Sequence, residues 1–208
     1  MMNKVYLGID IGGTAAKFGL VDEDGNILHR DEFSVSFDGY ETPILKTVLE
    51  KTEYFVASGG LSFRDISGIG VSATGQIDSV NGEVIGSAGH IKNWVGSKIK
   101  ESFEKKYSIK TIVINDANSA ALGEKWIGAG KGYKDIVAVT IGTGVGGGII
   151  VDSKILLGSK GFAGEIGHIP VNVDGEECSC GNTGCIEHYG STSALVINIK
   201  KAVISGEI

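Results

Sequence analysis

The apolar positions in the first quarter of the chain change from strand-like to helix-like spacing. Val5–Ile11 is a short apolar run typical of a strand, and a glycine-rich turn separates it from a second run, Lys17–Val21. Apolar residues then recur at helical spacing from Ile44 to Val56, between Pro43 and a pair of glycines. The pattern predicts a β-hairpin followed by a helix that packs on the sheet.

Three more elements are predicted between this helix and Asp116. Two short runs rich in β-branched residues have the character of buried strands, and a polar segment between them has apolar residues spaced for one helical face. These elements are strands over Ile66–Val71 and Thr111–Ile114 and a short helix over Ser97–Tyr107.

From Asp116 onward the pattern changes. An Ala-rich helix is predicted to begin at this residue, and strands over 136–141 and 149–151 then flank a glycine-rich loop. The succession of strand, glycine turn and strand repeats the plan of the amino terminus. We therefore expect an α/β protein with two related lobes, residues 1–114 and 115–208.

Composition and charge narrow the class of protein. Glycine supplies 33 of 208 residues, about 16% against a typical value of about 7%, while 42% hydrophobic and 21% charged residues indicate a folded chain. The net charge is −6, and without a basic run nucleic-acid binding is disfavoured. The longest uncharged stretch, Ile136–Val151, is shorter than the roughly 20 residues that span a bilayer. With no signal-peptide pattern, we expect a cytoplasmic protein that does not bind membranes.

Three cysteines and a histidine suggest a metal site. Cys178, Cys180 and Cys185 are odd in number and clustered within eight positions, so they cannot form a disulfide framework. With His168 they complete a Cys₃His set, which suits a structural zinc ion, and glycines between the cysteines allow the chain to reverse tightly. The alternative is a group of buried thiols without a metal.

Two glycine-rich turns and one carboxylate are candidates for phosphate chemistry. Asp10 precedes the turn Gly12–Thr14, where backbone amides can hold an anion and the carboxylate can hold a hydrated Mg²⁺; the alternative is an ordinary hairpin turn. Gly142–Gly148 contains the spacing of a dinucleotide motif, but a strand follows it, which favours a phosphate cradle. Asp116 is either a general base or a helix N-cap.

Taken together, these segments resemble the ROK family of sugar kinases and sugar-responsive repressors. The resemblance extends from the first strand nearly to the last residue. It implies a two-lobed, actin-like ATPase (ribonuclease H-like) fold with an interlobe cleft and a zinc-binding loop. The segments that carry it, in the family's order, are Asp10–Thr14, Asn115–Asn118, Gly142–Gly148, Ala163–His168 and Cys178–Glu187.

The resemblance also implies an activity, which is ATP-dependent phosphorylation of a hexose hydroxyl, usually on C6, with Mg²⁺ and a structural Zn²⁺. Asp116 is the implied base. The implied sugar-binding residues are Gly75, His90, Asn115, Glu165, His168 and Glu187. The implied nucleotide-binding residues are Asp10, Gly12, Gly13, Thr14, Lys17, Gly142, Thr143 and Gly144, and the implied zinc ligands are His168, Cys178, Cys180 and Cys185. Family members also suggest a homodimer or homotetramer.

Two departures from the family pattern bear on function. His90 stands where the family usually has an asparagine that contacts the sugar, so the identity of the hexose stays open. Family kinases are longer, whereas this chain stops at Ile208 in what looks like a helix, so we expect an incomplete nucleotide site. The alternative function is a zinc-stabilised protein that binds or senses sugar without turnover. Family repressors carry a DNA-reading domain before the first strand, which begins here at residue 5, so we expect the kinase branch.

Overall fold

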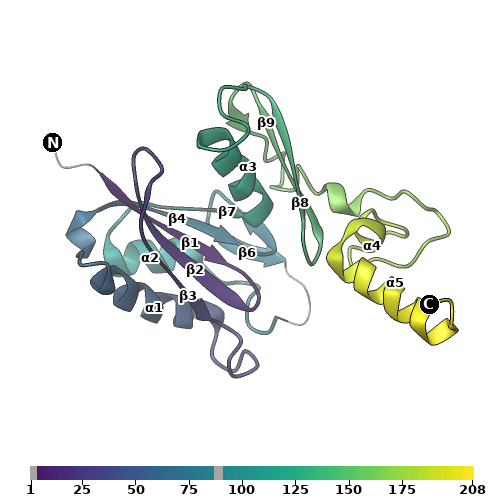
Figure 1. The fold of residues 1–208 in the computed structure, drawn as a ribbon. Helices are drawn as coiled ribbons and strands as arrows, with labels where there is room; N and C mark the ends of the chain where they lie inside the picture. The colour runs from purple at the N-terminus through teal and green to yellow at the C-terminus, as the bar shows by residue number, and fades with distance from the viewer. Residues whose placement is uncertain (1–3, 87–90) are drawn as a thin grey trace. The chain divides into compact units, whose positions relative to one another are not determined.

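The computed structural model describes residues 4–86 and 91–208, and the chain divides into two compact units (Figure 1). The first is Met1–Asp116 and the second is Ala117–Ile208. His90, one of the predicted sugar-binding residues, lies outside the described residues.

A five-stranded mixed sheet forms the centre of the first unit. Its strand order is β3-β2-β1-β4-β7. Strand β2 pairs antiparallel with both β1 and β3, and β4 pairs parallel with both β1 and β7. The predicted hairpin and the two later strands are confirmed. The bounds are β1 (Val5–Ile11), β2 (Ala15–Asp22), β3 (Ile27–Ser34), β4 (Ile66–Ala73) and β7 (Thr111–Asn115).

Two helices cover one face of this sheet (Figure 1). They are α1 (Ile44–Ser58) and α2 (Ile99–Tyr107), close to the predicted positions. Side chains of a strand alternate between its two faces, and the alternate residues Leu7 and Ile9 of β1 are buried with Phe55 of α1 in the core. The apolar periodicity of the sequence thus defines which face of the sheet is covered.

The first unit also contains short elements that the apolar pattern did not predict. A two-stranded hairpin and a single turn of 3₁₀ helix connect the larger elements, and each is too short to show a period in the sequence. They are β5 (Gln76–Asp78), β6 (Glu83–Gly86) and η1 (Phe63–Asp65).

The second unit is built on a smaller antiparallel sheet of order β10-β9-β8. The Ala-rich helix α3 (Asp116–Trp126) begins where the sequence predicts it. The strands are β8 (Ile136–Ile141), β9 (Val145–Val151) and β10 (Lys154–Ile155).

One prediction in this unit is wrong. The glycine loop expected over 142–148 is only three residues long, because Gly146–Gly148 belong to β9. A Cβ atom on Gly148 would lie 2.5 Å from the Cβ of Ala121 and 2.8 Å from the carbonyl oxygen of Ala117, both in α3. Gly148 therefore allows the strand and the helix to pack closely.

The remaining elements follow the sheet. They are η2 (Ile166–His168), α4 (Glu187–Gly190) and α5 (Thr192–Ser205). The side chain of Ser191 caps α5 by accepting a hydrogen bond from the amide of Ala194, and Gly206 ends it in the left-handed conformation at φ 75°. The helix therefore ends before Ile208, whereas the sequence suggested that a helix continues to this residue. Among the described residues, none of the helices has the length and apolar character needed to cross a bilayer.

Candidate functional site

Most of the predicted site residues of the first unit lie at or just after the ends of three parallel strands. Ile11 of β1 pairs with Ala73 of β4, and Ala73 pairs with Asn115 of β7, so the three strands end in one row. The segments after these ends carry the predicted turn Gly12–Thr14 and Gly75. The carboxyl ends of parallel strands are where open α/β sheets bind ligands, so this edge is a candidate binding site.

Hydrogen bonds hold the first glycine turn in place. The amide of Gly12 donates to the carbonyl of Ala15 at 3.0 Å, and the Tyr40 hydroxyl donates to the carbonyl of Gly13 at 2.9 Å. Asp10, the last but one residue of β1, accepts a hydrogen bond from the Ser72 hydroxyl at 2.7 Å. The turn is thus a fixed backbone loop with an oriented carboxylate beside it, as a site for a phosphate and its cation requires.

Asn115 is also held by a specific contact. Its side-chain amide donates to the carbonyl of Gly75 at 3.0 Å, and Gly75 has φ 97°, which favours glycine. The neighbouring carbonyl of Thr74 accepts from the indole of the buried Trp94 at 2.9 Å. Asp116 comes next, as the first residue of α3, so the end of β7 positions both an amide and a carboxylate.

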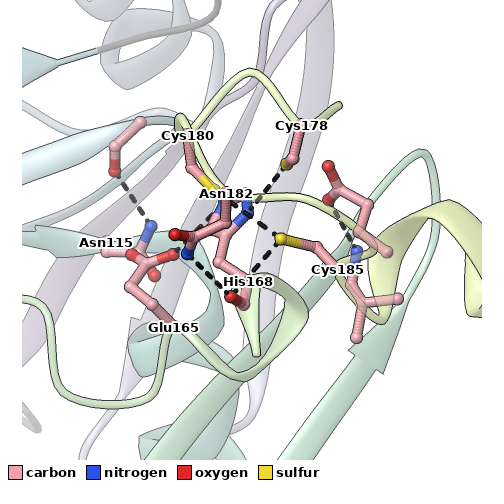
Figure 2. Close-up of polar contacts among 10 residues, drawn as sticks. Asn115, Glu165, His168, Cys178, Cys180, Asn182 and Cys185 are labelled. Carbon is pink, nitrogen blue, oxygen red and sulfur yellow. Dashed lines mark hydrogen bonds and ion pairs between the residues drawn. The ribbon is translucent and has the colours of Figure 1, made fainter. Parts of the chain in front are cut away.

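The predicted metal ligands come together in the second unit (Figure 2). The four ligand atoms of His168, Cys178, Cys180 and Cys185 lie within 4.8 Å of one another. The Cys178 sulfur is 3.5 Å from Nδ1 of His168, and the Cys180 and Cys185 sulfurs are 3.7 Å apart. A tetrahedral zinc ion, with bonds of about 2.3 Å to sulfur and about 2.1 Å to nitrogen, separates its ligands by about 3.6 to 3.8 Å. The donor atoms therefore suit a zinc ion, and the two separations of 3.5 and 3.7 Å are close to those that it requires.

Two of the thiols have different acidities. The backbone amide of Asn182 lowers the pKa of Cys180, whereas burial raises the pKa of Cys185 to about 12. Cys180 is exposed and Cys185 is buried. Since thiolates are the metal ligands, binding of a metal must displace the proton of Cys185.

The two predicted glutamates flank this cluster. Glu165 immediately precedes η2, and its carboxylate oxygen lies 3.9 Å from Nε2 of His168, the ring nitrogen on the side away from Cys178. A carboxylate near the second nitrogen of a metal-bound histidine helps to orient the ring. Glu187, the first residue of α4, accepts a hydrogen bond from the amide of Val145 at 3.1 Å.

The second glycine turn joins β8 to β9. The amide of Gly142 donates to the carbonyl of Gly144 at 2.9 Å, and the carbonyl of Gly142 accepts from the amide of Thr192 at 2.8 Å. Within the part of the chain that the structure describes, the amides of Thr143 and Gly144 donate no hydrogen bond. Two backbone donors of this turn are thus available to a ligand.

The structure groups the predicted residues within each unit. In the first unit, Lys17 is the strand partner of Asp10. The predicted residues near the strand ends of this unit are Asp10, Gly12, Gly13, Thr14, Lys17, Gly75 and Asn115. In the second unit, the turn of Gly142, Thr143 and Gly144 is contacted by Glu187 at Gly144 and by the amide of Thr192 at Gly142. Sequence reasoning missed Ser72, Tyr40 and Thr192, because their roles depend on strand register and on long-range backbone contacts that leave no local pattern.

Comparison with known proteins defines the class. The crystal structure of a ROK family glucokinase from Streptomyces griseus, in complex with glucose and AMPPNP, superposes with a TM-score of 0.81 and 36% identity, covering 98% of this chain. The protein thus has the α/β, actin-like ATPase fold expected from its sequence. Residues 6–206 match the model of the ROK family, and the chain belongs to this family.

Curated relatives include both enzymes and regulators. The chain is 34% identical over 189 residues to the glucokinase of Thermotoga maritima and 38% identical over 190 residues to that of Streptomyces coelicolor, in each case covering 91% of this chain. It is 33% identical over 195 residues to the xylose repressor of Bacillus subtilis, covering 93% of this chain and 50% of the repressor. The matches cover 58% and 57% of the two glucokinases and 62% of the S. griseus chain.

Proposed function

We propose that this chain is the core of an ATP-dependent hexose kinase of the glucokinase type. The observation that carries the proposal is the row of strand ends at Ile11, Ala73 and Asn115, because the predicted phosphate turn and two of the predicted sugar-binding residues, Gly75 and Asn115, lie at this row or directly after it. Glucokinases that are 34–38% identical to this chain also support it.

In the proposed reaction, Asp116 accepts the proton of the sugar hydroxyl, usually that on C6. The hydroxyl oxygen forms a bond to the γ-phosphorus of ATP, while the bond from that phosphorus to the bridging oxygen breaks and ADP leaves. Phosphoryl transfer depends mainly on positioning and on stabilisation of charge. We assign this task to the turn amides of Gly12–Thr14 and Gly142–Gly144, with Lys17 as a further nucleotide-binding residue and with Asp10 near the Mg²⁺ that neutralises the phosphates.

The remaining predicted residues are proposed to bind the sugar. This set consists of Gly75, His90, Asn115, Glu165, His168 and Glu187. We propose that a structural Zn²⁺ held by His168, Cys178, Cys180 and Cys185 fixes the loop that carries two of the carboxylates. When bound, the ion supplies a fixed tetrahedral cross-link and no reaction step.

The first test is the release of ADP from Mg-ATP by the 208-residue chain. Glucose, N-acetylglucosamine, N-acetylmannosamine, fructose and a β-glucoside are compared with a control without sugar. Release that depends on one sugar supports the kinase and names its substrate. Release without sugar would indicate an ATPase instead.

The second test concerns Asp116. Asp116→Asn keeps the size of the side chain but removes the base, and we expect kcat to fall by about 10²–10⁴-fold while sugar binding changes little. Asp174→Asn, which alters an exposed carboxylate of the second unit, is the matched control. Unchanged turnover in Asp116→Asn would show that another group takes the proton.

A second candidate function is a sugar-binding or sugar-sensing protein without turnover. The observation that favours it is the similarity to xylose repressors, which extends over 93–97% of this chain. Isothermal titration calorimetry distinguishes the two candidates. Sugar binding by zinc-loaded protein without any ADP release supports the sensor, and the absence of both binding and turnover would contradict both functions.

A further inference from the structure

One short segment of the second unit contacts the second glycine turn at both of its ends. The carboxylate of Glu187 accepts a hydrogen bond from the amide of Val145 at 3.1 Å, where β9 begins. The amide of Thr192, the first residue of α5, donates to the carbonyl of Gly142 at 2.8 Å, just after β8. The segment from 187 to 192 therefore closes over the turn that joins these two strands.

The fit between this segment and the turn is close. A Cβ atom on Gly144 would lie 2.2 Å from Oε2 of Glu187 and 3.2 Å from Cδ. Even the smallest side chain at this position would push the carboxylate away from the Val145 amide. The glycine thus has a specific role here, which is to leave space for the carboxylate.

The same segment begins at a ligand of the metal cluster. Cys185 is two residues before Glu187, and its carbonyl accepts from the amide of His188 at 3.0 Å. The amide of Ile186 donates to the carbonyl of Ile169 at 3.0 Å. This hydrogen bond joins the residue after Cys185 to the residue after His168. At the other end, the Ser191 hydroxyl accepts a hydrogen bond from the amide of Ala194 in the first turn of α5 and fixes the start of this helix.

We infer that the segment Cys185–Thr192 is a clamp that couples the metal cluster to the glycine turn Gly142–Gly144. Glu187 is its positioning residue at one end and the Thr192 amide is its second contact. When the cluster holds its metal, Cys185 is fixed and the clamp keeps the turn in one conformation. Without the metal, the clamp is held only by the flanking hydrogen bonds, and both contacts to the turn open more often.

Amide hydrogen exchange, read residue by residue by NMR, tests this coupling without any sugar or nucleotide. We compare zinc-loaded protein with protein treated with a chelator. Exchange at Val145 and Thr192 should become at least about tenfold faster without zinc, the change expected when a hydrogen bond to a charged or fixed partner is lost. Amides inside β9, such as Ile150, should keep their rates. Equal rates at Val145 and Thr192 with and without zinc would overturn the inference, and so would an equal acceleration throughout β9.

Substitution of Glu187 tests the contact itself. Glu187→Ala removes the acceptor, so exchange at Val145 should be fast in both the zinc-loaded and the zinc-free protein while the zinc content stays unchanged. Glu187→Gln keeps an acceptor oxygen at the same distance and should restore slow exchange in the zinc-loaded form. Glu177→Ala alters an exposed carboxylate next to Cys178 and is the matched control. Slow exchange at Val145 in Glu187→Ala would overturn the role of this residue.

The second contact has a variant that removes only one hydrogen bond. Thr192→Pro deletes the amide donor but suits the first position of a helix, and Ser191 already has the extended conformation, with φ −86° and ψ 160°, that a residue before proline adopts. Circular dichroism should show an unchanged helix content. A helix content that falls in this variant would show that it tests folding, in which case the Glu187 series decides the inference.

The consequence for nucleotide binding rests on the proposed function. We expect the affinity for Mg-AMPPNP to be about three- to tenfold lower in Thr192→Pro and in the zinc-free protein than in the zinc-loaded wild type. Zinc-loaded protein that binds no AMPPNP would count against the proposed function, whereas the exchange rates would still decide whether the clamp exists. If AMPPNP affinity is equal in all three samples while exchange at Val145 is fast in the zinc-free protein, the metal cluster affects the conformation of the turn but not nucleotide binding.

Discussion

The packing of β9 against α3 leads to a prediction whose size follows from the structure. In Gly148→Ala, the new methyl group would lie 2.5 Å from the Cβ of Ala121 and 2.8 Å from the carbonyl oxygen of Ala117. Carbon atoms in contact prefer about 3.5–4.0 Å, so the strand and the helix must separate by about 1 Å. The obstacle includes backbone, which cannot rotate away.

The expected cost is the difference between two effects. Overpacking of a tight site costs about 1–3 kcal/mol, and a contact with backbone belongs at the upper end of this range. Replacing a strand glycine by alanine returns about 0.5–1 kcal/mol of conformational entropy. We expect a net loss of about 2 kcal/mol, which corresponds to a decrease in Tm of about 4–8 °C for a chain of this size.

Thermal unfolding followed by circular dichroism measures this change, with two controls. Gly123→Ala lies in α3 itself, where nothing is within 4 Å of the new methyl group, and it should raise stability by about 1 kcal/mol. Gly70→Ala lies in β4 with equally open space and should not lower Tm. A Gly148→Ala protein that melts at or above the wild-type temperature would refute the argument from close packing.

Three further predictions concern the metal and pH. Protein purified without a chelator should contain about one zinc ion per chain, as measured by atomic emission. The Cys180→Ser variant should lose most of this zinc. The control variant His188→Gln, whose substitution lies outside the cluster, should retain it. Because burial raises the pKa of Cys185 to about 12, zinc must displace a proton, so competition with a chromogenic chelator should show weaker zinc binding as pH falls from 8 to 6. Hydrogen bonds from Asn26 lower the pKa of Asp22, so the stabilisation should be complete above its ordinary pKa of 3.8 and decrease as pH falls through the lowered value; Asn26→Ala should raise that pKa in an NMR titration.

Much of the fold follows from local pattern. The apolar alternation of Val5–Ile11 and the helical spacing from Ile44 to Val56 predict their elements, because each buries a single face. The grouping of His168, Cys178, Cys180 and Cys185 was also predictable, since a Cys₃His set at this spacing has few other uses, and the four ligand atoms do come together. The sequence did not predict that Gly146–Gly148 belong to a strand, because glycine marks a turn and a close contact between elements equally well.

The clamp on the second glycine turn illustrates what local pattern cannot provide. Glu187 was predicted as a residue of the site, but its hydrogen bond to Val145 joins residues 42 positions apart. The Thr192 amide has no sequence signature, because every residue except proline has one. Contacts of this kind depend on tertiary structure, and only the folded chain shows them.

The common row at the ends of β1, β4 and β7 also bears on how this protein can change over time. A residue inserted within β4 would move every later side chain of the strand to the opposite face and would break the row of Ile11, Ala73 and Asn115. A residue inserted in the segments after these strands would leave the core unchanged and alter only the candidate binding edge. Insertions and deletions should therefore be tolerated after the strand ends and eliminated within the strands.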